Sequence, residues 1–280
     1  MEYYLAEALA QRAEVIITGA GPQSNHIRAT AAAARVADLA VIAVVHDSPP
    51  AEAQGNLLLD ELLGAELIYT HNPDRAAVDT KINQVADEVQ QSGRRPYVIP
   101  RGGASGLGAL GYVECARELS AQFQDAQLKP HAIVLATGSC GTQAGLVAGA
   151  KILNAPWRIQ GITVSRPVSE CVERIARMAL DAARLTGHEI VVHSANVAVL
   201  DGFLGAGYGI PTPEGIDAIR LVARTEGVFL DPTYTGKAMA GLIAEIRAGQ
   251  FRKEETIVFL HTGGEPGLFA HPEIAHLSRG

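Results

Sequence analysis

The chain has 280 residues, of which 48% are hydrophobic and 19% charged, a composition typical of a globular protein with a sizeable core. The formal net charge of -7 and the lack of any run of lysines or arginines argue against nucleic acid or a membrane surface as partner. Three scattered cysteines without a C-x-x-C spacing do not make a disulfide framework, and no apolar tract is long enough to span a bilayer. We therefore expect a cytoplasmic protein with a small-molecule partner.

The first hundred residues predict strands and helices in strict alternation. Short apolar runs bounded by glycine or polar residues indicate strands, and apolar residues at helical spacing indicate the helices between them. Such alternation favours a parallel sheet with helices on both faces, because each parallel connection needs a crossover. Strands are expected at 14–19, 40–45, 65–70 and 96–100, and helices at 1–12, after the polar cluster 23–26, at 56–64 and at 74–93.

The second half repeats this logic after a segment rich in glycine. Residues 101–111 hold five glycines and are the candidate hinge between a smaller domain, 1–108, and a larger one, 109–280. The expected fold is therefore α/β, with two doubly wound parallel sheets. Helices are expected at 112–125, 141–151, 169–187, 213–227 and 238–249, and strands at 133–135, 158–165, 190–193 and 256–264.

Residues 133–152 read as a buried strand, a glycine-rich turn and a helix. Gly138, Gly141 and Gly145 allow a tight turn, and the N–H groups that open the helix would favour an anion. The pattern is not a P-loop, and Thr137 stands where a nucleophile elbow needs its first glycine. Taken alone, the segment fits either a ligand site or an ordinary strand-to-helix turn.

Three other chemistries have to be weighed. The run GAGPQS at 19–24 begins like a dinucleotide fingerprint, but Ser24 replaces its third glycine and Pro22 removes an N–H from the turn. The run HEIVVH at 188–193 lacks the spacing of a zinc helix and is expected in a strand, so no metal site is predicted. Cys140 could be a nucleophile, but no base lies near it in sequence, which favours a small residue in a tight loop.

Polar clusters follow three of the expected strands. They are Gln23 to His26, Thr137 to Ser139 and His261 to Gly264. Ligands of open α/β sheets bind beyond the carboxyl ends of the strands, where these clusters lie. Helix capping explains one serine or asparagine in each cluster. It explains their joint occurrence less well.

Several segments together resemble the D-cysteine desulfhydrase and 1-aminocyclopropane-1-carboxylate (ACC) deaminase family of pyridoxal-phosphate enzymes. The resemblance runs nearly end to end and implies a fold of the tryptophan-synthase-β type, with the site in the cleft between two domains, and a homodimer. Within the family the sequence is most similar to D-cysteine desulfhydrase, with L-cysteate sulfo-lyase a near relative. The segments are GAGPQSNHIRATAAA, NLLLDELLGAE, RPYVIPRGGASGLGALGYVE, ATGSCGTQAG, GAGYGIP, DPTYTGKAMAGLI and FLHTGGEPGLFA.

The resemblance also implies how the cofactor, pyridoxal 5′-phosphate, would be held. Asn25 would contact the 3′-oxygen of the pyridine ring. Thr235 stands at the position that faces the ring nitrogen, where the deaminase branch carries Glu. The cofactor phosphate would be bound by four consecutive residues of the glycine-rich turn, Ser139, Cys140, Gly141 and Thr142.

The same resemblance implies the substrate site and the catalytic residues. Ser24, with neighbouring backbone, would hold the substrate carboxylate, and the loop Gln23, Ser24, Asn25 and His26 would bind the substrate. Tyr208 and Tyr234 would flank the substrate and the cofactor ring and, with Ser24, are the candidate catalytic residues. No metal is implied.

The hydroxyl of Thr235 favours one reaction over the other. A carboxylate at this position keeps the ring nitrogen protonated and the electron sink strong, whereas a hydroxyl leaves it weaker. A weaker sink suits loss of a good leaving group from Cβ. We therefore expect β-elimination from a sulfur-containing amino acid such as D-cysteine, giving pyruvate, ammonia and sulfide, rather than opening of a cyclopropane ring.

One element of the family is missing from the sequence. The Schiff-base lysine of the family lies in a G-G-N-K segment just before the helix that begins here at Met1. Lys237 does not replace it, because the family carries a lysine there as well as the catalytic one. The chain is therefore expected to be truncated, which its uncapped first helix favours, or to be a non-catalytic homologue that binds the cofactor or another ligand.

Overall fold

The structure, a computed structural model, describes residues 1–271 and 274. The chain divides into two compact units, Met1–Ala104 and Ser105–Gly280. Each unit contains its own four-stranded sheet, in which every pair of neighbouring strands is parallel. The predicted class, α/β with two doubly wound parallel sheets, is confirmed.

The first unit has the strand order β3-β2-β1-β4. In the central strand, Val15 pairs with Ala40 of β2 on one side and with Pro96 of β4 on the other. A short 3-10 turn, Arg101–Gly103, follows the last strand. The strands are β1 (Val15–Ala20), β2 (Ala40–Val45), β3 (Glu66–Tyr69) and β4 (Pro96–Val98), and the helices are α1 (Glu2–Ala10), α2 (Asn25–Val36), α3 (Asn56–Leu62) and α4 (Ala76–Gln91).

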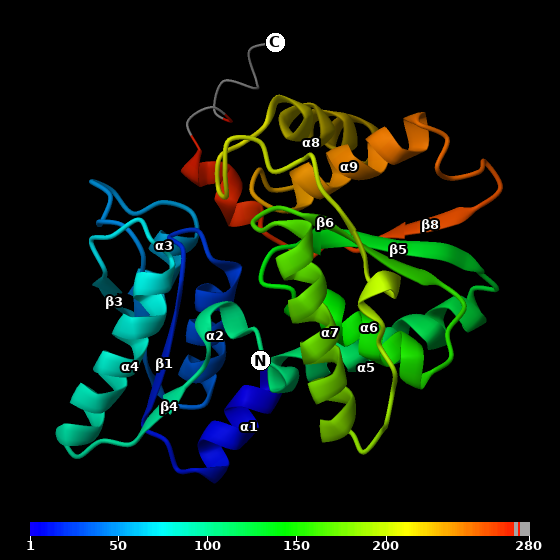
Figure 1. Cartoon of the computed structure of the whole chain (residues 1–280). Coiled ribbons are helices and arrows are strands. Elements are labelled where there is room, and N and C mark those ends of the chain that lie inside the picture. Colours follow the sequence, from blue (N-terminus) through cyan, green and yellow to red (C-terminus); the bar gives the residue numbers. More distant parts are fainter. Residues whose placement is uncertain (272–273, 275–280) are drawn as a thin grey trace. The chain divides into compact units, whose positions relative to one another are not determined.

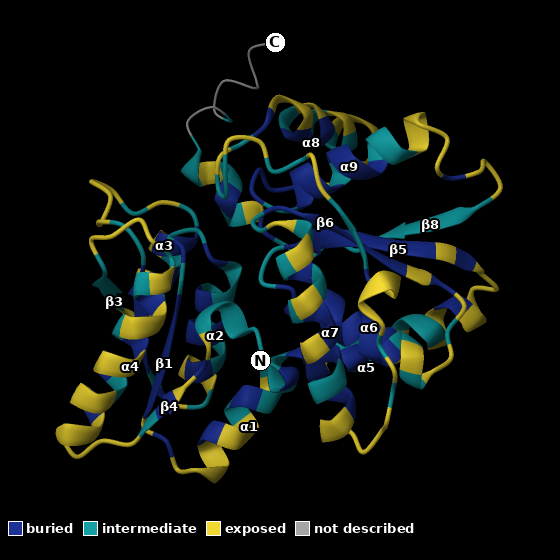
Figure 2. Cartoon of the chain, in the orientation of Figure 1, coloured by how far each residue is buried: buried dark blue, intermediate teal, exposed yellow. Residues whose placement is uncertain are grey.

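Helices cover both faces of this sheet (Figure 1). On one face, α4 packs residues spaced three or four apart, among them Val78 and Ile82, against Val15 and Ile17 of β1. On the other face, Ile27 of α2 packs against β2. Because β1 is covered on both sides, it is buried over most of its length (Figure 2), which is why its sequence is continuously apolar.

The second unit has the strand order β7-β6-β5-β8. Figure 1 shows α8 and α9 on one side of the sheet and α5, α6 and α7 on the other. A cluster of buried side chains, including Val134, Ile162 and Leu242, joins the sheet to α9. The strands are β5 (Pro130–Thr137), β6 (Arg158–Thr163), β7 (Ala198–Leu200) and β8 (Thr256–Phe259), and the helices are α5 (Gly106–Asp125), α6 (Gly141–Ile152), α7 (Val168–Leu185), α8 (Pro213–Glu226) and α9 (Thr235–Arg247).

The glycine-rich segment 101–111 is only partly a loop. The helix predicted at 112–125 is present and ends at Asp125, but α5 begins earlier than predicted, at Gly106. The Ser105 side chain accepts a hydrogen bond from the Gly108 N–H at 3.1 Å and so caps the helix. Gly106 serves close packing, since a Cβ at this position would lie 2.6 Å from the Asp181 Cβ of α7.

The predicted strand at 190–193 was wrong, since these residues are irregular and β7 forms at Ala198–Leu200. The apolar run does not reach the sheet, and Val191 is 64% exposed. The segment that does join the sheet, β7, is held by Gln143 of α6. The Gln143 side chain accepts a hydrogen bond from Thr137 Oγ1 at 2.6 Å and donates one to the Ala198 carbonyl at 2.8 Å. The amide crosses Gly161 of β6, where a Cβ would occupy the same space.

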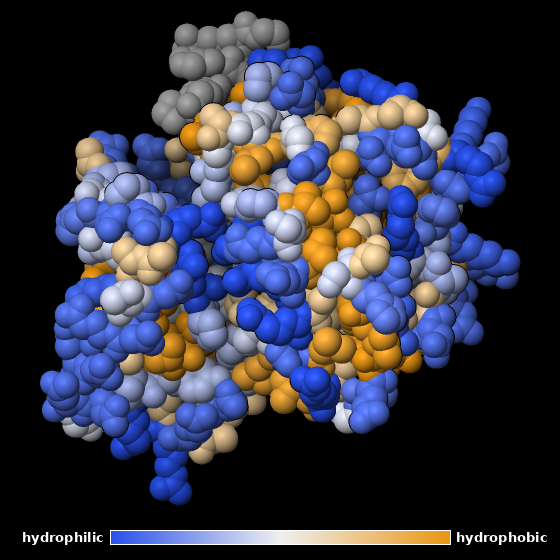
Figure 3. Space-filling model, viewed as in Figure 1, coloured by the Kyte–Doolittle hydropathy of each residue, from blue (hydrophilic) through white to orange (hydrophobic). Residues whose placement is uncertain are grey.

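Among the described residues, no helix is both long enough and apolar enough to cross a membrane. Hydrophilic residues cover most of the visible face of the first unit (Figure 3). Large exposed apolar side chains lie on helices, such as Val36 of α2 and Leu62 of α3, and in loops, such as Val228 and Phe229.

The contact between α5 and α6 depends on a glycine and can be tested there. A Cβ at Gly145 would lie 2.6 Å from the Tyr112 Cβ and would also meet the Ala109 carbonyl. Gly145→Ala should therefore lower the free energy of unfolding by about 1–3 kcal/mol. Gly111→Ala on α5 is the matched control, since a Cβ there meets nothing within 4 Å, and it should raise stability by up to about 1 kcal/mol. Equal effects in urea denaturation would contradict this account of the packing.

Candidate functional site

The predicted substrate loop lies at the carboxyl end of β1 and the start of α2. Ser24 is buried, with 3% of its surface exposed, and its Oγ accepts a hydrogen bond from the Ile27 N–H at 3.3 Å. This serine therefore caps α2. Its hydroxyl proton is not used by the cap and can still be donated to a ligand oxygen.

Asn56, at the start of α3, holds this loop. Its backbone N–H donates to Gln23 Oε1 at 2.8 Å, and its side-chain Nδ2 donates to the Gln23 carbonyl at 3.1 Å and to Asn25 Oδ1 at 2.9 Å. Gln23 Nε2 donates to the Gln54 carbonyl at 3.0 Å. Both ends of the Gln23 amide are thus bonded to the segment 54–56, so this side chain shapes the loop.

His26 is held as a neutral imidazole with a defined proton position. Its Nε2 lies 2.8 Å from Thr18 Oγ1, and that hydroxyl donates its own proton to the Ile99 carbonyl at 3.1 Å. The proton between Nε2 and Thr18 must therefore sit on Nε2, which leaves Nδ1 as an acceptor. Burial lowers the pKa of His26 to about 4, so the ring is neutral at neutral pH.

In the second unit, the glycine-rich turn joins β5 to α6. Cys140 occupies the capping position of α6 in the left-handed conformation, with φ of 76°, and gives the helix no side-chain cap. The N–H groups of the first turn, at Gly141, Thr142 and Gln143, precede the first intrahelical bond, which runs from Ala144 to the Cys140 carbonyl. With the helix dipole behind them, these donors form a cradle that fits an anionic group such as a phosphate.

The turn is fixed from its outer side through one carbonyl. The Gly138 oxygen accepts hydrogen bonds from Ser165 Oγ at 2.9 Å and from Arg166 Nε at 3.3 Å. The same guanidinium forms an ion pair with Glu170 of α7. This arrangement orients the turn before any ligand is bound.

Cys140 is a poor nucleophile in this setting. Its thiol is buried, and its Sγ lies 3.7 Å from the Gly138 carbonyl. A hydrogen bond with Cys171, together with burial, raises the pKa of the Cys140 thiol above its ordinary value. A neutral thiol attacks slowly, so the geometry favours Cys140 as a small residue in a tight turn.

A buried carboxylate organises the start of α9. Asp231 Oδ2 accepts from the N–H groups of Thr233 and Tyr234, and Oδ1 accepts from the N–H and the hydroxyl of Thr235 at 2.8 and 2.7 Å. Thr235 Oγ1 also accepts the Asp231 N–H at 2.8 Å. Since its proton is donated to Asp231, the Thr235 oxygen can only accept a further hydrogen bond.

The two candidate tyrosines lie together. The hydroxyls of Tyr208 and Tyr234 are hydrogen-bonded, and their rings meet edge to face with centroids 6.0 Å apart. The Tyr234 ring also reaches the glycine-rich turn, since a Cβ at Gly138 would lie 3.5 Å from it. The second unit therefore brings together Tyr208, Tyr234, Thr235 and the glycine-rich turn.

Lys237 anchors the loop that carries Tyr208. Its side chain is fully buried, and Nζ donates to the carbonyls of Leu204 at 2.7 Å and Gly207 at 3.1 Å. Burial lowers the pKa of Lys237 to about 8. The sequence marked this lysine only as close to the site, because the two carbonyls that it binds lie about thirty residues earlier in the chain.

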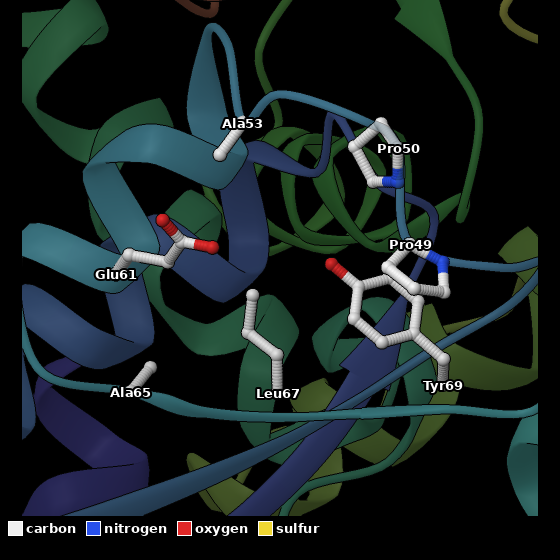
Figure 4. A pocket seen from close by; sticks show the side chains of 7 residues that line it. All are labelled: Pro49, Pro50, Ala53, Glu61, Ala65, Leu67 and Tyr69. Carbon is white, nitrogen blue, oxygen red and sulfur yellow. The ribbon is translucent and has the colours of Figure 1, made fainter.

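A separate pocket of about 280 Å³ lies in the first unit, between the loop at 49–53, α3 and β3 (Figure 4). Its lining includes Pro49, Glu61 and Tyr69, and none of the predicted site residues takes part. Within the described part of the chain, no group of three or more His, Cys, Asp or Glu side chains could hold a metal ion.

Comparison with known proteins identifies the family. The sequence pattern of pyridoxal-phosphate dependent enzymes matches residues 1–263. The chain belongs to this family. It is similar to a crystal structure of an ACC deaminase homologue, with 38% identity, a TM-score of 0.89, and coverage of 97% of this chain and 80% of that chain. The resemblance found in the sequence is thereby confirmed.

Solved structures of lower sequence identity share the fold. A threonine deaminase from T.th. matches with a TM-score of 0.60 and 20% identity over 94% of this chain and 81% of that chain. A hydrogen sulfide-producing enzyme from Fusobacterium nucleatum matches with a TM-score of 0.63 and 18% identity over 95% and 84%. The family depends on pyridoxal phosphate, and the uncapped N-terminus of α6 fits the phosphate group of that cofactor.

Two titratable groups of the first unit, whose pKa values are displaced by folding, predict opposing pH effects. The folded-state pKa of His26 is lowered from 6.5 to about 4, so its contribution to stability is present above pH 6.5 and is lost as the pH falls. Burial raises the pKa of Asp60 from 3.8 to about 7, against the opposing charge of Arg28, so its contribution is present at low pH and is lost as the pH rises.

The two effects should separate in single variants. Relative to wild type, Asp60→Asn should make stability rise more steeply with pH between about pH 4 and 6.5, and His26→Asn should make it fall. Each difference has a limiting slope of about 1.4 kcal/mol per pH unit. The measurement is urea denaturation across this pH range. Variant curves that run parallel to wild type would show that neither pKa is displaced by folding.

The role of Asp231 can be tested by removing one of its acceptors. Asparagine keeps the shape but offers one oxygen to four donors, so Asp231→Asn should cost about 2–4 kcal/mol of stability. The control is Asp217→Asn on α8, whose carboxylate is exposed and forms a surface ion pair with Arg220. That change should stay within about 0.5 kcal/mol. A similar loss in both variants in thermal denaturation would argue against the central role of Asp231.

Proposed function

We propose that this chain uses pyridoxal phosphate to eliminate the sulfur group from a small amino acid such as D-cysteine. The Cα proton leaves, the Cβ–S bond breaks with its electron pair on sulfur, and water releases ammonia from the resulting enamine. The products are pyruvate, ammonia and sulfide. The observation that carries this proposal is Thr235, a hydroxyl where the deaminase branch is expected to carry a carboxylate, with its proton committed to Asp231.

The residues of the second unit would bind the cofactor. Ser139, Cys140, Gly141 and Thr142 would surround the phosphate at the start of α6, where the donors have no cap. Thr235 would face the ring nitrogen with a neutral oxygen, which stabilises a protonated nitrogen less than a carboxylate would. When bound, the cofactor supplies an electron sink for the pair left by the Cα proton.

The remaining residues would bind the substrate and manage protons. Ser24 would donate its hydroxyl proton to the substrate carboxylate, with Asn25 directed to the 3′-oxygen of the cofactor and Gln23 shaping the loop. His26 would stay neutral, with its acceptor at Nδ1. The paired hydroxyls of Tyr208 and Tyr234 share a hydrogen bond and would hold a proton for the departing sulfur.

Lys237 is not proposed as the Schiff-base lysine of the family. Its Nζ is fully buried and bound to two backbone carbonyls, and freeing it would release the loop that carries Tyr208. We also propose a homodimer in the cytoplasm, on the grounds of the family resemblance and the acidic, cysteine-poor composition. Two other activities remain as outcomes of the test, ACC deamination and cofactor binding without turnover.

The reaction is tested with the protein expressed from its gene, including any residues that precede Met1. With added pyridoxal phosphate, D-cysteine should give equal amounts of sulfide and pyruvate, and ACC should give no 2-oxobutanoate. Production of 2-oxobutanoate without sulfide would replace the proposal with deamination. Binding of the cofactor without either product would indicate a non-catalytic homologue.

Matched tyrosine variants show whether the activity belongs to this site. Tyr234→Phe removes one of the paired hydroxyls and should lower kcat/KM about 100-fold if that group moves a proton in the rate-limiting step. Tyr69→Phe, in the separate pocket, should leave kcat/KM unchanged. Equal rates in both variants would remove Tyr234 from the mechanism.

A further inference from the structure

We propose that Arg28 and Asn56 are positioning residues that fix the Asn25 amide, so that Asn25 presents its NH₂ group to a ligand oxygen. The proposal rests on the proposed function, in which Asn25 faces the 3′-oxygen of pyridoxal phosphate. It follows from a chain of three contacts in the first unit. Each contact allows only one assignment of donor and acceptor.

The first contact joins Arg28 of α2 to Asn56 of α3. Arg28 Nε lies 2.8 Å from Asn56 Oδ1. A guanidinium has only donors, so the atom of Asn56 that faces it must be the oxygen. Asn56 is buried, with 1% of its surface exposed, so its amide has no solvent to satisfy the opposite orientation.

The second contact confirms this orientation from the other end of the amide. Asn56 Nδ2 lies 3.1 Å from the carbonyl oxygen of Gln23, which can only accept. The nitrogen and oxygen of an amide side chain are assigned from such contacts. Here a group that only donates and a group that only accepts require the same assignment.

The third contact passes the orientation on to Asn25. Asn56 Nδ2 also lies 2.9 Å from Asn25, and because Nδ2 is a donor, the atom of Asn25 that faces it must be Oδ1. The NH₂ group of Asn25 is therefore on the opposite branch of the amide. Two N–H donors match an anionic oxygen, whereas a carbonyl oxygen at the same place would repel it.

A buried carboxyl group, Asp60, lies within the electrostatic influence of Arg28. Asp60 of α3 is fully buried, and neither of its carboxylate oxygens has a hydrogen-bond partner in the described part of the chain. The positive charge of Arg28 acts on this carboxyl and opposes the effect of burial. The recorded hydrogen bond of the guanidinium is the one from Nε to Asn56 Oδ1 at the start of α3.

The test compares two ligands, pyridoxal phosphate and its 3-deoxy analogue, which lacks the ring oxygen. Wild type should bind pyridoxal phosphate about 10- to 100-fold more tightly than the analogue, because only the former accepts from Asn25. Asn56→Asp places an acceptor against Asn25 Oδ1, so the Asn25 amide should rotate. Its NH₂ group would then point to residue 56 and its oxygen to the ligand. The preference for pyridoxal phosphate should then be lost, while affinity for the analogue stays within about twofold. Fluorescence titration measures both.

Arg28→Met provides a second route, since it frees the Asn56 amide to rotate and should reduce the preference without adding a charge. Arg28→Lys keeps a donor and should restore most of the preference. Gln54→Glu adds a negative charge on the exposed segment before Asn56 and controls for charge alone; it should leave the preference intact. A merely structural role of Asn56 would weaken both ligands equally.

The outcomes separate the two proposals. If wild type prefers pyridoxal phosphate and both Asn56→Asp and Arg28→Met keep that preference, the positioning role is overturned and the proposed function stands. If wild type does not bind pyridoxal phosphate, the proposed function fails and the inference fails with it. Loss of the preference in both variants, with rescue by Arg28→Lys, supports the positioning role.

Discussion

The buried carboxylate of Asp231 is the interaction on which the candidate site of the second unit depends. It gathers three backbone N–H groups and one hydroxyl, and in doing so it starts α9 and sets the orientation of Tyr234 and Thr235. Gly264, with φ of 113°, packs directly on it, since a Cβ there would lie 2.7 Å from the Asp231 Cγ. One charge thereby connects two of the sequence segments that carry the family resemblance.

The helices α2 and α6 both begin beside predicted site residues, but their N-termini differ in how the first N–H groups are satisfied. Ser24 caps α2 with its own hydroxyl, whereas Cys140 offers α6 no side-chain acceptor and lies in the left-handed region. An anion would therefore be bound more strongly at the start of α6, where no side chain accepts from the first N–H groups of the helix. A polar cluster after a strand thus provides a side-chain cap for α2 in the first unit, whereas α6 in the second unit has none.

The sequence predicted well what depends on local pattern. The apolar run at 40–45 predicted a strand, and the glycine-rich turn predicted a helix from Gly141. The structure contains both at these positions. The prediction failed where contacts between residues far apart in the sequence determine where a helix or strand begins. Gly106 reads as loop but serves helix packing, and β7 forms where the Gln143 amide can reach the Ala198 carbonyl. Asn56, Asp231 and Lys237 act through hydrogen bonds that no spacing reveals, so their roles in the candidate site came only from the structure.

Lys237 lies close to the candidate site, but its amine is hydrogen-bonded to the backbone of a neighbouring loop. An amine attacks a carbonyl through its lone pair, and a pKa near 8 brings that lone pair within reach at neutral pH. Here the nitrogen is committed to the carbonyls of Leu204 and Gly207. An imine at this nitrogen would keep at most one N–H, so its formation would break at least one of the two hydrogen bonds that support the neighbouring loop.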